Sequence, residues 1–557
     1  MKTKILGLLL IIILIVSSCK NYFDYENSSL MKENMVFSDY TLLKQVLANA
    51  YTQLPTSFNR IDNGMLASAT DESEHAWDYS SIQNFNTGSW NSFSNPDDVW
   101  TRQYQMIRRS YLFLNGTDTV TFKQFRYVDD VTYNRYVLEL KQFRAQSRFL
   151  IAFSYFELFK RYGGVPIVNR LLAVDEDLDL PRSSVTDVVK FIVANCDSAI
   201  KVLPKVYDAT NTGRATIGAA MALKCRTFLY ASSPLYNNGT YNKVLCDSAA
   251  RIASSFIVTG GTLKSTYSLE SNYGTLFTRK YNSLELIFDR RDGNVNTFEK
   301  ANFPIGFDGA GVGATCPSQN LVDAYEMKTT GKPISDPASG YDPANPYLNR
   351  DPRLGFTVIW NNSTFKARPI ELWTGGLDGK GKEKASKTGY YLKKYVDDNL
   401  NLLLNNTSRH CWYYFRLGEI YLNYAEAMNE AFGPADARYG LTAYDAVKAI
   451  RVRAGMPALT ATDYATSDVL REKIRNERRI ELAFEEHRSW DVRRWQIAES
   501  TLGADLRGMD VVKNADATFN YTPYVVEKRI FLQKMYYYPI PDAEMVKEKK
   551  LVQNPGW

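Results

Sequence analysis

Residues that could support metal or acid–base chemistry are sparse in this chain. It contains three histidines, His75, His410 and His487, and none belongs to an H-E-x-x-H pattern. The chain also lacks a phosphate-binding P-loop, a G-x-S-x-G nucleophile motif and a glycine-rich dinucleotide fingerprint. His410 precedes Cys411, but one neighbouring His-Cys pair does not make a metal site. We therefore expect no catalytic residues, no metal and no cofactor.

Carboxylates are plentiful, and a glycosidase needs only two of them at the right separation. The nearest candidates are the doublets Asp71-Glu72 and Glu485-Glu486. Adjacent side chains on a helix or strand point in different directions, so we interpret both doublets as solvated charges. A surface-anchored hydrolase stays open as the alternative function.

The densest run of charge is Arg471–Trp495, which is rich in arginine. Arginines in such a run could bind an anion or a phosphate. Alternatively, they could form structural ion pairs with carboxylates at helical i,i+3 spacing, such as Glu472 with Arg475 and Glu481 with Arg478. We favour the structural interpretation and expect one helix over Arg475–Trp495.

Aromatic residues are unusually frequent, with 37 Tyr, 28 Phe and 9 Trp. Most must pack in the core, but two loop-rich stretches, Ser57–Asp98 and Asp289–Asn405, carry rings among polar residues. Long irregular segments in a large fold usually serve function more than packing, although any one ring could instead pin its loop to the core. The candidate ligand-binding residues are Trp77, Tyr79, Trp90, Arg290, Trp360 and Trp373.

The N-terminus has the parts of a bacterial lipoprotein signal. Lys2 and Lys4 precede an apolar run, Ile5–Val16, that is too short to span a bilayer, and Ser17-Ser18 precede Cys19. Val16-Ser17-Ser18-Cys19 resembles a lipobox, in which the cysteine is acylated and becomes the new N-terminus. We predict a signal peptide over residues 1–18, lipidation of Cys19 and a tether over residues 19–40.

The remaining composition excludes other classes. Beyond Cys19 the chain has five cysteines, an odd number without C-x-x-C spacing, which argues against a disulfide scaffold and a zinc site. The formal net charge of +6 is small for 557 residues and evenly spread, which argues against a nucleic-acid partner.

Helical periodicity predicts the elements that would position these residues. Apolar side chains recur at steps of three and four in several segments, each followed by a shorter amphipathic partner. Small residues at contact positions, such as Ala145 and Ala219, indicate tetratricopeptide-like hairpins separated by long insertions. The four expected pairs are 41–54 with 96–115, 145–159 with 185–203, 217–228 with 242–255, and 417–428 with 442–454. A short strand is expected over Leu354–Trp360.

Several segments also carry a family resemblance. Arg475–Trp495, R-N-E-R-R-I-E-L-A-F-E-E-H-R-S-W-D-V-R-R-W, resembles the C-terminal signature of the SusD/RagB family of Bacteroidetes outer-membrane lipoproteins. That family commonly has Gly where Glu486 stands. Further similar pieces follow in family order: Tyr162-Gly163-Gly164-Val165-Pro166, Asp351-Pro352-Arg353-Leu354, Tyr538-Pro539-Ile540-Pro541 and Gln553-Asn554-Pro555-Gly556-Trp557.

The resemblance implies a mainly α, SusD-like fold with four tetratricopeptide-like helix pairs and an irregular, loop-rich ligand-binding face. It implies an N-terminal helical region over residues 41–260 and a C-terminal region with the loop-rich insertion over residues 261–557. It further implies a non-catalytic surface lipoprotein, lipid-anchored in the outer membrane, that captures glycans and delivers them to a SusC-like TonB-dependent transporter. A peptide-binding RagB-like lid is the alternative within the same family.

Overall fold

The computed structural model describes residues 33–173, 176, 179–278 and 283–557. Cys19, the predicted signal peptide and most of the predicted tether lie outside the described residues. The last part of that tether forms a short helix, α2 (Glu33–Ser38), directly before the first long helix. Among the described residues, no helix is both long enough and apolar enough to cross a membrane.

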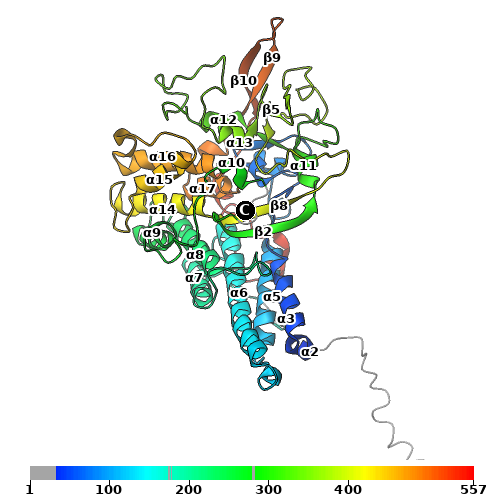
Figure 1. Cartoon of the computed structure of the whole chain (residues 1–557), viewed down its shortest axis with the longest axis vertical. Coiled ribbons are helices and arrows are strands. Elements are labelled where there is room, and N and C mark those ends of the chain that lie inside the picture. The colour runs from blue at the N-terminus through cyan, green and yellow to red at the C-terminus, as the bar shows by residue number, and fades with distance from the viewer. Residues whose placement is uncertain (1–32, 174–175, 177–178, 279–282) are drawn as a thin grey trace, which may run out of the picture.

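The four predicted helix pairs are confirmed, and each packs side by side in the structure (Figure 1). Residues on both sides of position 260 share one hydrophobic core, because α9 (Lys243–Ile257) of the N-terminal region packs against α14 (Leu417–Phe432) of the C-terminal region. The paired helices are α3 (Tyr40–Tyr51) with α5 (Trp100–Gly116), α6 (Asp130–Tyr162) with α7 (Val185–Ile200), α8 (Ile217–Ala231) with α9 (Lys243–Ile257), and α14 (Leu417–Phe432) with α15 (Ala443–Arg453).

Local sequence explains where these helices begin and end. Ser184, Thr216 and Thr442 each cap a helix by accepting a backbone N–H in the first turn, which satisfies a donor that has no partner within the helix. Gly163 ends α6 with φ of +73°, a conformation that suits glycine. A Cβ on the following Gly164 would lie 2.2 Å from a backbone oxygen, so the chain can turn there only with glycine.

The remaining elements lie between and after the helix pairs, and most of them are short. Helix α16 (Ser467–Glu481) is as long as the paired helices α8 and α9. The other helices are α4 (Gln83–Asn86), α10 (Tyr273–Leu276), α11 (Thr297–Asn302), α12 (Gln319–Ala324), α13 (Leu354–Thr357), α17 (Arg488–Arg494), α18 (Ala498–Thr501) and α19 (Asp542–Lys547). The strands are β1 (Ser73–His75), β2 (Leu286–Val295), β3 (Thr315–Pro317), β4 (Val358–Ile359), β5 (Thr364–Phe365), β6 (Arg368–Pro369), β7 (Tyr391–Leu392), β8 (Ser408–Arg416), β9 (Leu506–Lys513) and β10 (Phe519–Glu527).

The strands of the described residues pair two by two and antiparallel, β1 with β3, β2 with β8, β4 with β7, β5 with β6, and β9 with β10. The expectation of a strand over Leu354–Trp360 was wrong for its first half, which forms α13. Two contacts stabilise this helical turn. Arg353, directly before it, donates to Asp351 at 2.7 Å, and the Thr357 hydroxyl at its end donates back to the Arg353 carbonyl.

The Arg475–Trp495 segment is structural, but it is two helices and not one. Helix α16 ends at Glu481, and the chain turns through Phe484 (φ +60°) and Glu486 (φ +61°) before α17 begins. The expected pair of Arg475 with Glu472 forms at 2.8 Å. The expected pair of Glu481 with Arg478 was wrong, because Glu481 binds Arg353, Arg416 and Arg453 from other segments and Arg478 binds Asp491 of α17.

The molecule has two distinct ends. Helices α3, α5 and the first half of α6 project together as a stalk, and α2 lies on it where the described chain begins (Figure 1). The loop-rich segments and the β9–β10 hairpin lie at the opposite end (Figure 1). The accessible rings among the predicted ligand-binding residues belong to the loop-rich segments, at the end opposite the stalk.

Candidate functional site

Trp77 and Tyr79, which we call the aromatic platform, form a stacked pair in the turn after β1. Their ring centroids lie 5.2 Å apart and their planes differ by 18°. The Tyr79 side chain is 78% exposed, whereas Trp77 is half-buried against Ala301, Val312 and Ala314. The pair thus presents a flat aromatic face to solvent and is supported from behind by apolar contacts.

His75, the last residue of β1, fixes the start of this turn. The backbone N–H of Trp77 donates to His75 Nδ1 at 3.0 Å, and His75 Nε2 lies 3.0 Å from the Asp62 carbonyl oxygen. Burial lowers the pKa of His75, which favours the neutral ring. A neutral ring protonated on Nε2 satisfies both contacts, since Nδ1 is then an acceptor and Nε2 a donor.

The Asp62 carboxylate fixes the end of the same turn. It accepts hydrogen bonds from the Ser80 hydroxyl at 2.9 Å and from the Ser81 backbone and hydroxyl at 2.7 Å each. Burial raises the pKa of Asp62, but these hydrogen bonds outweigh it and leave the pKa lowered, so Asp62 is ionised at neutral pH. Nearby, a Cβ at Gly64 would lie 2.5 Å from His75 Cδ2, which requires glycine at that position.

Polar and charged groups border the aromatic platform. Asp78, which lies between Trp77 and Tyr79 in the sequence, forms an ion pair with Lys387. The Lys387 carbonyl accepts a hydrogen bond from the Tyr524 hydroxyl. Trp77 Nε1 has no hydrogen-bond partner among the described residues. The surroundings therefore offer donors and acceptors beside an apolar face, the usual composition of a site for a polar ligand with apolar surfaces.

Five half-buried rings, which we call the aromatic strip, form a second group along one face of β10. Tyr347 stacks on Trp360 with centroids 5.2 Å apart and contacts Tyr521 edge to face at 5.6 Å. Phe519 continues the strip, 6.4 Å from Tyr521 and 5.4 Å from Trp373. Two of the predicted residues, Trp360 and Trp373, thus belong to one continuous aromatic surface.

The aromatic platform and the aromatic strip lie on opposite sides of β10. Phe519 and Tyr521 point to one face of the strand, and Tyr524, which contacts the loop beside the platform, points to the other by the alternation of side chains along a strand. The predicted ligand-binding residues therefore form two groups.

Two of the predicted residues do not take part in either group. Trp90 is only 2% exposed and packs against Phe85, Tyr538 and Trp557 in the core. The prediction that Trp90 contacts the ligand was therefore wrong, because aromatic rings from the C-terminal segment cover it.

Arg290 lies on β2, where its side chain is held by the protein itself. It donates to the Leu54 carbonyl at 2.5 Å and pairs with Asp292 at 3.2 Å. These contacts tie β2 to the loop after α3, and they give Arg290 a structural role in place of the predicted ligand contact.

The two carboxylate doublets are not solvated, so that expectation was also wrong. Asp71 is buried and binds Arg479 at 2.7 Å and Arg488 at 2.8 Å. Glu485 is buried and binds Arg416 and Lys394, each at 2.7 Å. Their partners come from distant parts of the chain, and ionised groups are buried only when they are paired in this way.

Sequence reasoning missed Tyr347, Phe519, Tyr521 and Lys387. A signal for two of them was present, since Phe519-Asn520-Tyr521-Thr522 alternates aromatic and polar residues with the period of a strand. Tyr347 and Lys387 lie in irregular loops and carry no local pattern.

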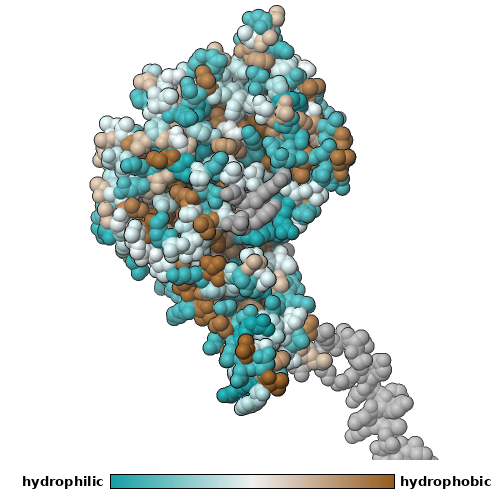
Figure 2. Space-filling view, in the orientation of Figure 1, coloured by the Kyte–Doolittle hydropathy of each residue, from teal (hydrophilic) through white to brown (hydrophobic). Residues whose placement is uncertain are grey.

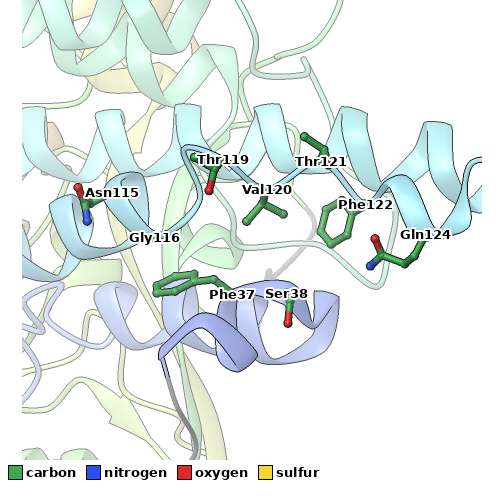
Figure 3. A pocket seen from close by; sticks show the side chains of 9 residues that line it. All are labelled: Phe37, Ser38, Asn115, Gly116, Thr119, Val120, Thr121, Phe122 and Gln124. Atoms are coloured by element: carbon green, nitrogen blue, oxygen red, sulfur yellow. The ribbon is translucent and has the colours of Figure 1, made fainter.

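A separate cavity of about 610 Å³ lies far from both aromatic groups, on the stalk (Figure 3). Phe37 of α2 faces it from one side, and Val120 and Phe122 from the segment after α5 face it from the other (Figure 3). Its position marks where α2 rests on the stalk and does not connect to the loop-rich end.

Comparison with known proteins gives one consistent result. Residues 273–557 match the SusD family, and residues 21–229 match a family described as starch-binding and associating with the outer membrane. A SusD-like protein of Bacteroides ovatus is 22% identical, over 100% of this chain and 97% of that protein.

Solved structures show the same fold. A crystal structure of a SusD-like protein from Bacteroides fragilis superposes with a TM-score of 0.78 at 28% identity, covering 94% of this chain and 98% of that one. A SusD-like carbohydrate-binding protein from the same species superposes with a TM-score of 0.76 at 22% identity, covering 93% and 100%. The fold, the ordered sequence motifs and the match over the C-terminal half of the chain agree: this chain belongs to the SusD family.

Proposed function

We propose that this protein is a non-catalytic, lipid-anchored glycan-binding protein of the outer membrane. It captures oligosaccharides on the aromatic platform of Trp77 and Tyr79 and passes them to a SusC-like TonB-dependent transporter. The observation that carries this proposal is the stacked pair itself, in which a ring that is 78% exposed is held in a turn fixed at both ends.

Glycans fit this surface better than other ligands. A pyranose ring has an apolar C–H face that can stack on an aromatic ring, and its hydroxyl groups can bond to nearby charged groups such as Asp78 and Lys387. A peptide held in an extended form would instead need a free strand edge and apolar side-chain pockets. The family description over residues 21–229 and the carbohydrate-binding neighbour support the same ligand class.

The carboxylates support binding without catalysis. Asp71 and Glu485 are neutralised by buried arginine or lysine partners. Glu72 has a pKa raised to about 8 by burial and by Asp71, which would suit an acid catalyst, but its side chain is only 1% exposed. A substrate on the aromatic platform would not reach it without unfolding the turn.

Ring substitutions with matched controls test the binding site. Tyr79→Ala and Trp77→Ala should each weaken oligosaccharide binding by roughly tenfold, about 1.4 kcal/mol, because a stacking face is removed. Tyr79→Phe keeps the ring and should bind nearly normally. Phe93→Ala removes an equally exposed ring elsewhere and should have no effect. Isothermal calorimetry against a panel of oligosaccharides, with melting temperatures for every variant, measures both quantities.

Each outcome of that experiment has a meaning. Normal binding by both Trp77→Ala and Tyr79→Ala would show that the ligand does not bind on the aromatic platform. Loss of binding in Trp360→Ala or Trp373→Ala would instead place the ligand site on the aromatic strip. Binding of peptides but not of oligosaccharides would favour the peptide-binding alternative. Release of new reducing ends from the bound glycan would favour a hydrolase.

The transporter partnership has its own test. Affinity purification of the lipidated protein from membranes in mild detergent should recover a large β-barrel protein in near-equal amount. Recovery of the lipoprotein alone would argue against a stable complex with a transporter.

A further inference from the structure

The end of the stalk carries an exposed group of apolar side chains, which we call the apolar tip and define as Tyr127, Val128, Val131 and Leu138. The first three lie between the 3₁₀ turn Lys123–Phe125 and the first turn of α6, and they are 89%, 85% and 81% exposed. Single exposed apolar residues are common on soluble proteins, but a cluster of them usually marks an interaction site. Figure 2 shows apolar surface at this lower end of the molecule.

The apolar tip is firmly supported. Asp129 caps α6 by accepting the Thr132 N–H at 3.0 Å. Directly behind the tip, Tyr136 stacks on Tyr40 of α3 with centroids 3.8 Å apart and contacts Phe125 edge to face at 5.4 Å. The exposed side chains are therefore displayed on a packed backbone and are not the result of a frayed helix end.

Charged residues of both signs accompany these apolar side chains: Lys123, Arg126 and Arg135 are exposed, and so are Asp129 and Asp130, of which Asp129 caps α6. Val131, Arg135 and Leu138 follow one another at helical spacing on one face of α6, and Lys123 and Arg126 are exposed beside Tyr127. Tyrosine, aliphatic and basic side chains together are the combination found where a protein surface meets lipid headgroups.

The described chain begins at the same end of the molecule. Figure 1 shows α2 and the start of α3 on the stalk. Phe37 of α2 packs against Phe113 of α5, and Tyr40, whose ring supports the tip, begins α3. Thirteen residues separate the proposed lipid attachment at Cys19 from Glu33, so the two positions lie at most about 50 Å apart. An acylated Cys19 would hold the stalk near the membrane.

We propose that the apolar tip inserts among the lipid headgroups of the membrane that anchors the chain. This inference rests on the lipid anchor of the proposed function. Tyr127, Val128 and Val131 enter the interfacial region, while Lys123 and Arg126 lie against phosphate groups. The tip and the lipid then hold the stalk end of the molecule at the membrane through two contacts.

A lipid surface explains the tip better than a protein partner. A stable protein interface buries about 800 Å² on each side. Three side chains at the turn and a fourth farther along α6 offer less than that, whereas a fluid headgroup layer adapts to a convex shape.

Fluorescence from a single labelled cysteine tests the insertion. Val128→Cys carries an environment-sensitive nitrobenzoxadiazole dye at the tip, and Val512→Cys carries it on β9 at the opposite end of the molecule as the control. Labelling is selective because the five cysteines after Cys19 are buried and Cys19 is acylated. The lipidated proteins are reconstituted into vesicles of phosphatidylethanolamine and phosphatidylglycerol that contain a doxyl-labelled quencher lipid.

We expect both proteins to float with the vesicles, and only the dye at position 128 to shift its emission to the blue and be quenched. Adding Val131→Asp to the Val128→Cys protein should at least halve that quenching without changing flotation. Flotation without a shift at position 128 would overturn the insertion and leave the anchor standing. Failure to float would refute the anchor and the insertion together. A shift that appears only with a co-reconstituted transporter would assign the tip to a protein partner.

Discussion

Replacement of Glu481 by alanine should destabilise the protein more than a typical substitution does. The Glu481 carboxylate is fully buried and binds three arginines: Arg353 at 3.0 Å, Arg416 at 2.8 Å, and Arg453. Burial raises the pKa of Glu481, but the three arginines outweigh burial and hold the pKa well below its usual range. The negative charge of Glu481 therefore compensates the positive charges of three buried arginines.

The magnitude follows from what remains after the substitution. Removing one partner of a buried ion pair costs about 3–5 kcal/mol, because the opposite charge stays buried without compensation. For a chain of about 520 ordered residues, the unfolding entropy is roughly 1.1 kcal/mol per degree near 60 °C. The expected loss in melting temperature is therefore about 3–5 °C.

Glu472→Ala is the matched control, since Glu472 lies on the same helix and pairs with Arg475 at 2.8 Å but is 70% exposed. An exposed pair contributes at most about 1 kcal/mol, so this variant should melt within about 1 °C of wild type. Differential scanning calorimetry at pH 7 compares the two. Because the pKa of Glu481 is depressed, its contribution is present above about pH 4.5 and declines as the pH falls below that value. Equal melting temperatures for the two variants, or lost glycan binding by a fully stable Glu481→Ala, would refute the structural assignment.

Three further predictions concern single positions. Folded Glu72, with a pKa of about 8, resists ionisation, so the wild-type protein loses stability as the pH rises from about 4.5 to 8. Glu72→Gln carries no charge at this position, so its free energy of unfolding relative to wild type should rise over this range by at least ~2 kcal/mol, measured by chemical denaturation. A difference independent of pH would contradict this. Gly64→Ala should displace His75 and weaken glycan binding measured by calorimetry, whereas Gly293→Ala, whose Cβ meets no atom within 4 Å, should not; equal binding by both would show that the turn does not depend on His75. Cys19→Ala should move the protein from the membrane to the soluble fraction, and continued sedimentation with outer membranes would disprove the lipid anchor.

The helix pairs could be predicted from the sequence because the signals that make them are local. Apolar residues at steps of three and four define the buried face of α9, and Asn242 before it supplies the cap. The same holds for α15, where Thr442 and Asp445 form a capping box. Such signals lie within one or two turns of the residues that they organise.

The turn inside Arg475–Trp495 could not be read from helical periodicity, because charged and apolar residues continue the pattern through it. The cue was the family's usual glycine at position 486. Glu486 has φ of +61°, a conformation that costs a non-glycine residue about 1 kcal/mol and that ion pairing to Arg60 at 3.0 Å helps to hold. A departure from a family glycine thus marked a backbone turn.

The prediction that the doublets Asp71-Glu72 and Glu485-Glu486 are solvated was wrong for a different reason. The arginines that bury Asp71 lie more than 400 residues away in sequence, and nothing near Asp71 indicates them. A charged residue next to loop-forming residues looks solvated until its distant partner is known.

Trp77 and Trp90 show why the ligand site itself was only partly predictable. Both lie in the same loop-rich stretch among polar residues, yet the C-terminal rings Tyr538 and Trp557 cover one and leave the other half-exposed. The fate of each ring depends on which distant segment returns to it, and local composition does not encode that. What distinguishes Trp77 is a turn held at both ends by hydrogen bonds of His75 and Asp62, with only one side of the ring packed, against Ala301, Val312 and Ala314. A ring held in this way can face solvent without destabilising the fold, which is the property that a ligand-binding surface requires.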